Sequence, residues 1–414
     1  MRNIIEFDAM DPAFQRDPIP MFERLHAADA MLLDPAIDAY FLGRHEDVAQ
    51  ALRSDVFTTA PLAESAQPMM GDRVLAQMEG QEHKAKRGLV LSAFSGRSNR
   101  ERHAQIIARV TSALLAESLR RGRLDLINDF GKAYSMLVTL EALGLPTDRY
   151  LDVIAWHSGV ATFVTSLRLT EAQRLHSVAC SQAFIAYLTP LVEDLRGSSR
   201  DGLIPLLCNP AAGGGMTTPE TVALVLNVVL AAAEPSDKAL AYLFHHLVSC
   251  PTLLDRVRND RHLLAPAIAE TLRISSPVQL IPRQINDDAT VGGVRLAAGT
   301  RVFCMPGAAN RDPSVFRDPT TFDINRRKAA QQAPIGGAAS MHFAFGTGTH
   351  MCVGAAFSLM QLELTANILL DHLRDLRTPP GFMLEEEGFY TRGPVAMPLE
   401  FAPYDGAVPL GPRT

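Results

Sequence analysis

Helical periodicity is the dominant pattern of hydrophobic and polar positions along this chain. Apolar residues recur at steps of three and four in several long segments, a spacing that places them on one face of an α-helix. The predicted helices lie near residues 101–120, 149–166, 171–196, 217–249, 261–274 and 353–376. The pattern therefore predicts a mainly α-helical protein.

Strand-like segments are short and few. They are predicted at 39–42, 289–295, 301–304 and 397–401, each with Gly, Pro or Asp at or near its ends, and 329–340 is predicted to be an Ala-, Gln- and Gly-rich loop. No Ser/Gly-rich or charged linker divides the 414 residues. We expect residues 1–414 to form a single domain, mainly α with small β-sheets.

The longest apolar segment runs from Thr221 to Leu247 and follows the sequence Thr-Thr-Pro-Glu at 217–220, which predicts a capping box with an early proline. Within this helix Asn227, Ala231 and Glu234 are spaced by four and then three residues, so they share one face. The asparagine either binds a substrate oxygen or bonds to nearby backbone, and both interpretations stay open.

Charge and composition exclude some classes of function. With 39 basic and 45 acidic residues the net charge is −6, which gives no reason to expect nucleic-acid binding. No apolar run of about twenty residues appears, and the first residues carry charge, so no membrane anchor is expected. The five cysteines form no C-x-x-C pattern. We expect a soluble, cytoplasmic protein.

One glycine-rich segment, Phe345–Gly354, brings a cysteine to the start of a predicted helix. Glycines allow sharp turns and close approach to a flat ligand. At a helix start the sulfur of Cys352 faces unpaired N–H groups, which favours the thiolate, a ligand for iron. The alternative is a small buried hydrophobe. The remaining cysteines lack the spacing of a metal site: Cys180, Cys208, Cys250 and Cys304.

The pattern F-G-x-G-x-H-x-C-x-G in this segment resembles the haem-thiolate loop of the cytochromes P450, and matching segments extend from His83 to Pro394. The resemblance implies a helix-rich triangular prism that holds haem b between the long central helix and the cysteine-bearing helix. Cys352 would be the metal ligand, with Phe345 and Gly346 beside it in the cofactor-binding loop. The resemblance is to the soluble bacterial type.

Haem carries two propionates that need cationic or hydrogen-bonding partners. His83 and Arg87 match the family's H-x-x-x-R site, and Arg283 and His350 match two further donors. Each of these residues alone would be read as a surface charge. A nearby basic cluster is either a solvated helix face or the docking site of an acidic ferredoxin or flavoprotein: Lys84, Lys86, Arg87, Arg97, Arg100 and Arg102.

Glu270 and Arg273 match the family's E-x-x-R motif, and 321–326 resembles its F-D-x-x-R segment. An exposed pair of this kind contributes only a few tenths of a kcal/mol, so the pair alone is a weak signal. The resemblance implies that Glu270, Arg273 and Arg326 form a buried ionic lock with a structural role.

The central helix departs from the family pattern A/G-G-x-D/E-T-T/S, because Pro235 occupies the position of the first threonine. Proline lacks an N–H and clashes with the carbonyl four residues back, so it should free the carbonyl of Ala231 and kink the helix. Ser236 is rotated by about 100° from that position. Proton delivery would then depend on Glu234 with ordered water, or on a substrate hydroxyl. The alternative is a kink without chemical effect.

Taken together, the resemblance implies a monooxygenase that oxidises, by hydroxylation, a hydrophobic small molecule with O2 and two electrons. Ferredoxin and an NAD(P)H-dependent reductase are the expected electron donors, and a monomer is expected. Glu234, Pro235 and Ser236 are the candidate catalytic residues. The expected substrate contacts are Asn227, Ala231, Val278, Ile281 and Val395, with further walls at 55–80 and 158–185.

Two alternatives accompany this hypothesis. The replacement of threonine by Pro235 favours a haem-thiolate enzyme that uses peroxide or performs oxidative coupling. A non-catalytic haem sensor would also fit Cys352, although the acid on the central helix and the apolar pocket favour chemistry. These residues leave open the substrate, the atom oxidised and the redox partner.

Overall fold

The computed structural model describes residues 2–94, 97–198, 202–326 and 342–403, so the predicted loop at 329–340 lies outside the described residues. Contacts along the chain define two compact units. We call the first, Met1–Leu62 with His262–Ala355 and Glu385–Pro394, the sheet unit. The second, Ala63–Arg261 with Ala356–Leu384 and Val395–Thr414, is the helical unit.

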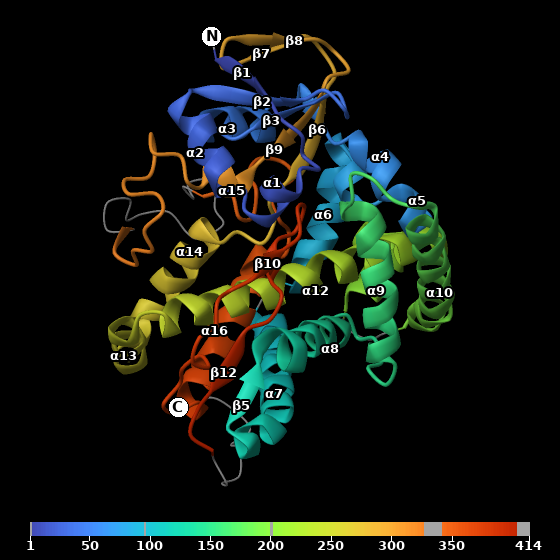
Figure 1. Cartoon of the computed structure of the whole chain (residues 1–414). Helices are drawn as coiled ribbons and strands as arrows, with labels where there is room; N and C mark the ends of the chain where they lie inside the picture. The colour runs from blue at the N-terminus through green and yellow to red at the C-terminus, as the bar shows by residue number, and fades with distance from the viewer. Residues whose placement is uncertain (1, 95–96, 199–201, 327–341, 404–414) are drawn as a thin grey trace. The chain divides into compact units, whose positions relative to one another are not determined.

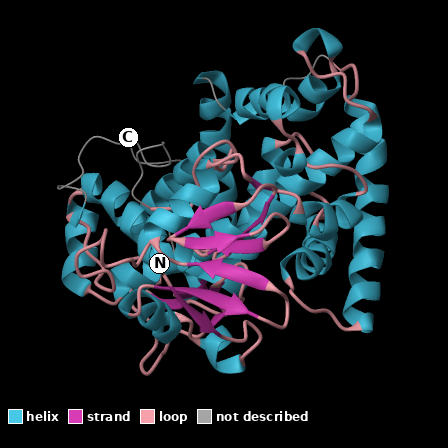
Figure 2. Cartoon of the chain, turned by 90° about the horizontal axis from the view of Figure 1, so that it is seen from above, coloured by secondary structure: helices cyan, strands magenta, loops and turns pink. Residues whose placement is uncertain are grey.

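The sheet unit contains a mixed, six-stranded sheet among its described residues, seen in Figure 2 as neighbouring arrows. The strands follow the order β1 (Asn3–Glu6), β2 (Ala30–Asp34), β3 (Ala39–Leu42), β9 (Arg301–Cys304), β6 (Ile281–Ile285) and β4 (Phe57–Thr58). β1 pairs in parallel with β2, and β3 in parallel with β9. Two small pairs accompany it: β7 (Ala289–Val291) with β8 (Val294–Leu296), and β10 (Glu386–Glu387) with β11 (Gly393–Pro394).

Short helices complete this unit: α1 (Pro12–Arg16), α2 (Ile19–Ala27), α3 (His45–Arg53), α14 (Leu264–Ile274) and α15 (Pro306–Ala309). Alternation along the strands directs one face inward, so Val302 and Cys304 are buried while Arg301 is exposed. They join a core that includes Leu42, Val48 and Phe343. The sheet unit thus has its own hydrophobic core.

The helical unit is built around its longest helix, α12 (Thr218–Val248), which contacts α8, α9 and α10 (Figure 1). Its other helices are α5 (Gln67–Met70), α6 (Gly80–Phe94), α7 (Arg97–Arg121), α8 (Lys132–Ala142), α9 (Tyr150–Thr165), α10 (Glu171–Leu195), α11 (Leu203–Cys208) and α13 (Pro251–Asn259). α4 (Pro61–Ser65) and α16 (Ala355–His372) each begin in the sheet unit and continue into the helical unit. β5 (Arg123–Asp125) pairs with β12 (Pro398–Glu400).

Remaining turns of helix lie at Leu75–Gln77, Leu126–Gly131, Pro210–Ala212 and Arg261–Leu263, the second of them π-helical. α9 and α10 lie side by side and approach closely at Gly159, where an added Cβ would lie 2.4 Å from the sulfur of Cys180. Glycine at 159 is therefore a packing requirement of this pair.

The predicted fold class is confirmed: the chain is mainly α with small sheets. Predicted helix bounds agree with α7, α9, α10, α12, α14 and α16 within a few residues, and β3 and β9 agree fully. Residues 289–295, predicted as one strand, form β7 and part of β8 around the turn Gly292-Gly293. The periodicity did not reveal β1, β2 or the helices α3, α6 and α8. The single-domain organisation stays a prediction.

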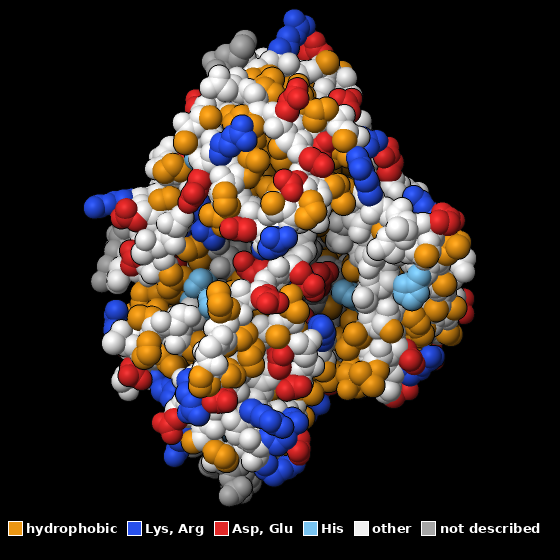
Figure 3. Space-filling view, viewed as in Figure 1, with side chains coloured by type: hydrophobic (Ala, Val, Ile, Leu, Met, Phe, Trp, Pro, Cys, Tyr) orange, Lys and Arg blue, Asp and Glu red, His pale blue; other side chains and the backbone are white. Residues whose placement is uncertain are grey.

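Among the described helices, α10 is long and apolar enough to cross a membrane. A core helix can pass the same test of length and composition, so this is a weak indication of a membrane span. On the face shown in Figure 3, acidic and basic side chains are interspersed among hydrophobic ones. This mixture agrees with a net charge of only −6 on 414 residues.

His103 is a fully buried histidine of the helical unit. Its ring contacts those of Phe94 and Phe357, with centroid distances of 5.7 and 5.0 Å, and the two phenylalanine rings also contact each other at 5.2 Å. Burial, with a smaller contribution from the neighbouring Arg102, lowers the pKa of His103 to about 4. The protein therefore holds this imidazole in its neutral form at physiological pH.

His103→Phe is expected to reduce the loss of stability in acid. Between pH 6.5 and about 4 the unfolded chain binds a proton at His103 that the folded chain does not, so the free energy of unfolding falls as pH falls. The histidine accounts for up to about 3 kcal/mol of this fall. Urea unfolding at pH 7.5 and 5 measures it, with the exposed His262→Gln as control. Equal acid losses in wild type and His103→Phe would contradict the prediction.

Candidate active site

The loop that carries Cys352 is folded by its own backbone. The Cys352 N–H donates to the carbonyl of Phe345 at 2.9 Å, and the Gly346 N–H donates to the carbonyl of Phe343 at the same distance. The Met351 N–H bonds to the carbonyl of Gly348 at 3.1 Å. These bonds fix the turn before α16, which begins three residues after the cysteine.

Two glycines permit this turn. Gly346 and Gly348 have φ angles of +65° and +75°, a region in which side chains are disfavoured. At 348 an added Cβ would lie 2.3 Å from the carbonyl oxygen of Leu52, which is a severe overlap. At 346 the nearest atom is the Ile281 Cδ1, at 3.8 Å. The loop thus packs closely against α3 and lies beside a predicted substrate contact.

Cys352 differs from the cysteines of the core. Its side chain is exposed, whereas Cys180, Cys208 and Cys304 are buried. Burial raises the pKa of Cys304 to about 12, so that residue is a structural thiol. The alternative that Cys352 is one more buried hydrophobe does not describe the structure.

Arg283 lies on β6, two residues after Ile281, and is buried. Its Nη1 donates to the carbonyl of Pro282 at 2.8 Å. Burial raises the pKa of Tyr390 to about 12, and the charge of Arg283 opposes that rise. His350 is half-buried in the cysteine loop, and Val278 pairs with Thr391 in an isolated bridge.

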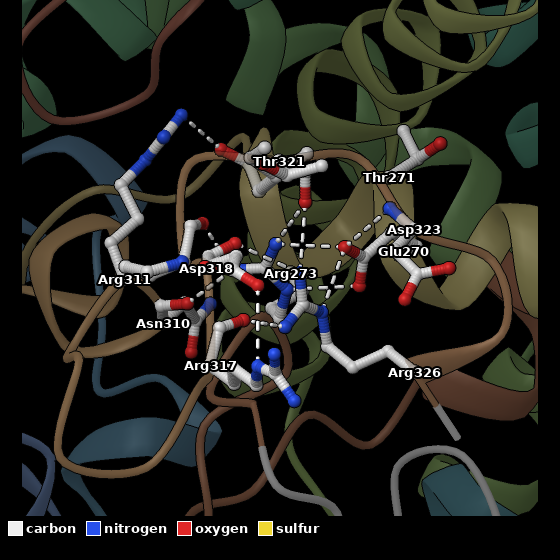
Figure 4. Close-up of polar contacts among 12 residues, drawn as sticks. Glu270, Thr271, Arg273, Asn310, Arg311, Arg317, Asp318, Thr321, Asp323 and Arg326 are labelled. Atoms are coloured by element: carbon white, nitrogen blue, oxygen red, sulfur yellow. Dashed lines mark hydrogen bonds and ion pairs between the residues drawn. The ribbon is translucent and has the colours of Figure 1, made fainter. Parts of the chain in front are cut away.

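The structure brings Glu270, Arg273 and Arg326 together (Figure 4). Arg273 contacts both carboxylate oxygens of Glu270, through Nε at 2.9 Å and Nη2 at 2.8 Å. The Arg326 Nε reaches the same carboxylate at 3.0 Å, and the backbone N–H of Asp323 donates to it at 3.0 Å. Glu270 and Arg273 are 5% and 2% exposed, so this is a buried charge group with full hydrogen bonding.

Arg273 also ties this group to the chain that follows α15. Its Nη1 donates to the carbonyls of Asn310 and Pro319, both at 2.8 Å, and its Nη2 donates to the carbonyl of Thr321 at 3.2 Å. The guanidinium lies 5.2 Å from the ring centre of Phe316. One side chain therefore holds several segments of the sheet unit.

In the helical unit, α12 begins with the predicted capping box: the Thr217 hydroxyl accepts from the Glu220 N–H, and Glu220 accepts from the Thr217 N–H at 2.7 Å. Most of α12 is buried, but Asn227, Ala231 and Glu234 are partly or fully exposed. Lys238, one turn after Glu234, forms an ion pair with its carboxylate. We call these four residues, at spacings of four, three and four, the open stripe of α12.

α12 continues as a helix through Pro235. Ser236, at the next position, is buried, and its hydroxyl donates to the carbonyl of Ala232 at 2.9 Å. This hydroxyl is therefore already engaged within the helix. Glu234, the acid of the predicted proton route, lies on the open stripe, whereas Ser236 does not.

Two charged or titratable neighbours of Glu234 escaped prediction. Asp237 is 5% exposed, its Oδ1 has no hydrogen-bond partner, and burial raises its pKa to about 7. His157 on α9 is buried, and its Nε2 lies 3.3 Å from the carbonyl of Leu230. Burial lowers the pKa of His157, against the opposing charge of Glu234. Asp237 could have been recognised from the sequence, because an acidic residue within an apolar helix is unusual.

The predicted propionate residues His83 and Arg87 both lie on α6, where their spacing of four places them on one face. His83 is 3% exposed and Arg87 is half-buried. Val395, a predicted substrate contact, is 40% exposed, and its carbonyl accepts from the side chain of Asn128 at 3.2 Å. These residues, like the open stripe, belong to the helical unit.

Each unit, taken by itself, carries side chains of the kinds that haem b requires. The sheet unit offers an exposed cysteine on a glycine-rich turn and the buried cation Arg283, and the helical unit offers His83 and Arg87 on one helical face. A soft thiolate suits iron, and buried cationic side chains suit carboxylates.

Comparison with known proteins gives a consistent result. The family model described as Cytochrome P450 matches residues 36–380. Pulcherriminic acid synthase of Bacillus subtilis (strain 168) is 43% identical over 403 residues, 97% of this chain and 98% of that protein. Cytochrome P450 107B1 of Saccharopolyspora erythraea is 29% identical over 388 residues, which cover 89% of this chain and 91% of that protein. The crystal structure of CalO2 superposes with a TM-score of 0.84 at 26% identity, and the superposition covers 96% of this chain and 99% of that chain.

The resemblance drawn from the cysteine loop is thereby confirmed over nearly the whole chain. Proteins of this family bind haem b through a cysteine thiolate, and bacterial members act on small molecules with electrons from redox partners. This chain belongs to the cytochrome P450 family and is a haem-thiolate monooxygenase.

Proposed function

We propose that this monooxygenase oxidises a hydrophobic small molecule in the formation of pulcherriminic acid or a closely related compound. The observation that carries the proposal is the 43% identity to pulcherriminic acid synthase across 97% of this chain and 98% of that protein. Identity at that level along the full length extends well beyond the motifs that all members of the family share.

Complementation tests this proposal. The gene for this chain, placed in a Bacillus subtilis strain that lacks its own pulcherriminic acid synthase, is expected to restore the compound, detected by mass spectrometry. The Cys352→Ser variant, expressed at the same level, serves as the inactive control. Absence of pulcherriminic acid, with folded haem-loaded protein present in the cells, would contradict the proposed product.

Cys352 is the proposed iron ligand, with Phe345 and Gly346 shaping its loop. Haem supplies the activation of dioxygen when it is bound. His83, Arg87, Arg283 and His350 are the proposed propionate partners, through charge and hydrogen bonds. The reduced, carbon monoxide-treated protein should show the red-shifted Soret band of a thiolate ligand. Survival of that band in Cys352→Ser would sink the assignment.

Ferredoxin and an NAD(P)H-dependent reductase are the proposed electron donors. Among the described residues of the basic cluster, Lys84, Arg97 and Arg100 are exposed, as a docking site for an acidic partner requires. The salt dependence of electron transfer measures this, because attraction between exposed charges weakens as ionic strength rises.

Proton delivery is proposed to depend on Glu234, whose carboxylate is paired with Lys238 on the same helix. Lys238 orients the acid on the open stripe of α12, and Pro235 contributes no hydroxyl there. The substrate is proposed to contact the same stripe at Asn227 and Ala231, together with Val278, Ile281 and Val395.

Pro235→Thr is expected to raise the fraction of NADPH consumption that ends in product when the substrate has no hydroxyl. The threonine would add a proton-donating group beside Glu234, where the wild type has none. Pro235→Ala is the matched control, because it removes the ring without adding a hydroxyl. The measurement is product formed per NADPH consumed. Equal values for wild type and Pro235→Thr would show that position 235 does not govern proton delivery.

A second candidate function is turnover with peroxide or oxidative coupling. It is favoured by one observation: the hydroxyl of Ser236 is bonded to the carbonyl of Ala232, so it does not replace the missing threonine. Turnover with hydrogen peroxide alone, compared with turnover with ferredoxin, reductase and NADPH, distinguishes the two. Faster product formation with peroxide would favour this alternative.

A further inference from the structure

Asn310, the residue that follows α15 and caps its C-terminal end, is fully buried, and each of its polar groups is hydrogen-bonded. Its backbone N–H donates to the carbonyl of Pro306 at 2.8 Å, and its carbonyl accepts from the Arg273 Nη1 at 2.8 Å. Figure 4 shows it beside Arg273. A buried amide with every group satisfied has one favourable orientation, because rotation would break several bonds at once.

The side chain of Asn310 joins two segments that are distant in the sequence. Its Nδ2 donates to the hydroxyl oxygen of Ser276 at 2.8 Å, just beyond the end of α14. Its Oδ1 accepts from the backbone N–H of Phe343 at 2.7 Å. Ser276 in turn donates to the carbonyl of Leu272 at 2.6 Å. The amide thus connects the helix that carries Glu270 and Arg273 to the start of the cysteine loop.

Phe343 is where this connection reaches the loop. Its carbonyl accepts from the Gly346 N–H at 2.9 Å, and the next turn places the Cys352 N–H on the carbonyl of Phe345 at 2.9 Å. The ring of Phe343 is 1% exposed and lies 4.5 Å, centre to centre, from that of His45. The backbone at 343 is therefore held on one side by packing and on the other by the Asn310 amide.

We propose that Asn310 is a positioning residue for Cys352: its amide oxygen holds the Phe343 backbone and thereby sets the turn that presents the thiolate. The role requires a side-chain oxygen that accepts the bond from the Phe343 N–H. Alanine lacks this oxygen and leaves the buried Phe343 N–H without this acceptor, whereas aspartate keeps the acceptor. The inference rests on the proposed function of Cys352 as the iron ligand.

The test compares Asn310→Ala, Asn310→Asp and Ser276→Ala in the haem-loaded protein. Asn310→Ala is expected to lose a large part of the thiolate-type Soret band of the reduced carbon monoxide complex, and its reduction potential is expected to shift. Asn310→Asp keeps the acceptor for Phe343 and is expected to keep the band. Ser276→Ala, which removes only the other partner of the amide, is the matched control and is expected to keep it too.

A second measurement does not depend on the iron. Hydrogen exchange of the Phe343 amide, followed by mass spectrometry or NMR, is expected to be roughly tenfold faster in Asn310→Ala than in the wild type or Ser276→Ala. If Asn310→Ala does not fold, Asn310→Ser provides the same comparison, because its shorter side chain does not span the two segments.

The outcomes separate this inference from the ligand assignment. A wild type without the thiolate band would refute the ligand assignment and, with it, the positioning of a thiolate by Asn310. A wild type with the band, together with an Asn310→Ala that keeps both the band and slow exchange at Phe343, would overturn the role of Asn310 alone. Loss of the band in Ser276→Ala to the same extent would also overturn it, since the Phe343 bond is then not the decisive contact.

Discussion

Arg273→Met is expected to lower the free energy of unfolding by about 3–5 kcal/mol, the typical cost of removing one partner from a buried ion pair. Arg273 donates two bonds to Glu270 and three to the carbonyls of Asn310, Pro319 and Thr321. Methionine fills much of the same volume but removes all five bonds. The carbonyls of Asn310 and Pro319 then lose the Arg273 guanidinium, and the buried Glu270 keeps only its bonds to Arg326 and to the Asp323 N–H.

Urea unfolding of the haem-loaded protein measures this effect. Arg326→Met is the matched control: it removes the second guanidinium from Glu270, but Arg326 is 17% exposed against 2% for Arg273, so water can replace part of its bonding. Its loss of stability should be smaller. The free energy of unfolding of Arg273→Lys should lie between those of wild type and Arg273→Met, because an ammonium group keeps the charge but not the bidentate geometry of the guanidinium. A cost below about 1 kcal/mol for Arg273→Met would contradict the structural role of the lock.

Asp237→Asn is expected to raise the free energy of unfolding above pH 7 by several kcal/mol. Asp237 is buried on α12, its Oδ1 has no hydrogen-bond partner, and burial raises its pKa from 3.8 to about 7. The charged groups around it are Lys238 and Glu234 on the same helix and Lys132 at the start of α8; the lysines oppose the rise and Glu234 adds to it. Asparagine is a neutral side chain of nearly the same shape.

The sign follows from proton binding. Between pH 3.8 and about 7 the folded protein holds a proton on Asp237 that the unfolded chain has lost, so stability falls as pH rises through this window. The difference between the two pKa values corresponds to about 4 kcal/mol. Wild type should therefore lose stability between pH 5 and 8, whereas Asp237→Asn should lose much less.

Chemical unfolding at pH 5 and pH 8, followed by circular dichroism, measures how the free energy of unfolding changes with pH in wild type and in Asp237→Asn. Asp255→Asn on α13 is the matched control, because it makes the same chemical change at an exposed position. An infrared band of a protonated carboxyl group, present near pH 6 and absent in Asp237→Asn, would provide an independent signature. Parallel pH profiles for wild type and Asp237→Asn would mean that Asp237 is not protonated in the folded protein.

Much of the fold could be predicted because long helices repeat their apolar residues at a period that the sequence displays. α12 was predicted from Thr217 onward by its capping box, and the structure shows both of its hydrogen bonds. Among the elements that were missed, β1 and β2 have only four and five residues, which give too little periodicity. β1 is an example: its residues are exposed except for the partly buried Ile5, and it is placed by pairing with β2, a contact between distant segments.

Residues that depend on a partner elsewhere were harder to predict. Glu270 and Arg273 are three residues apart, so their pairing follows from the helix, but their burial and the arrival of Arg326 follow from the folding of the chain after α15. Asn310 gave no signal in the hydrophobic pattern. Its importance depends on Ser276 and Phe343, which reach it only in three dimensions.

By itself the sequence determined the chemistry that this protein can offer: a cysteine in a glycine-rich turn, an acid and a proline in the central helix, and the family to which those motifs belong. These are local properties, set by residue type and short spacing. Only the tertiary structure decided which groups are desolvated and what they contact. It gave Asp237 its raised pKa, tied the Ser236 hydroxyl to Ala232 and joined Asn310 to the cysteine loop. Burial and hydrogen bonding depend on packing, which no short stretch of sequence specifies.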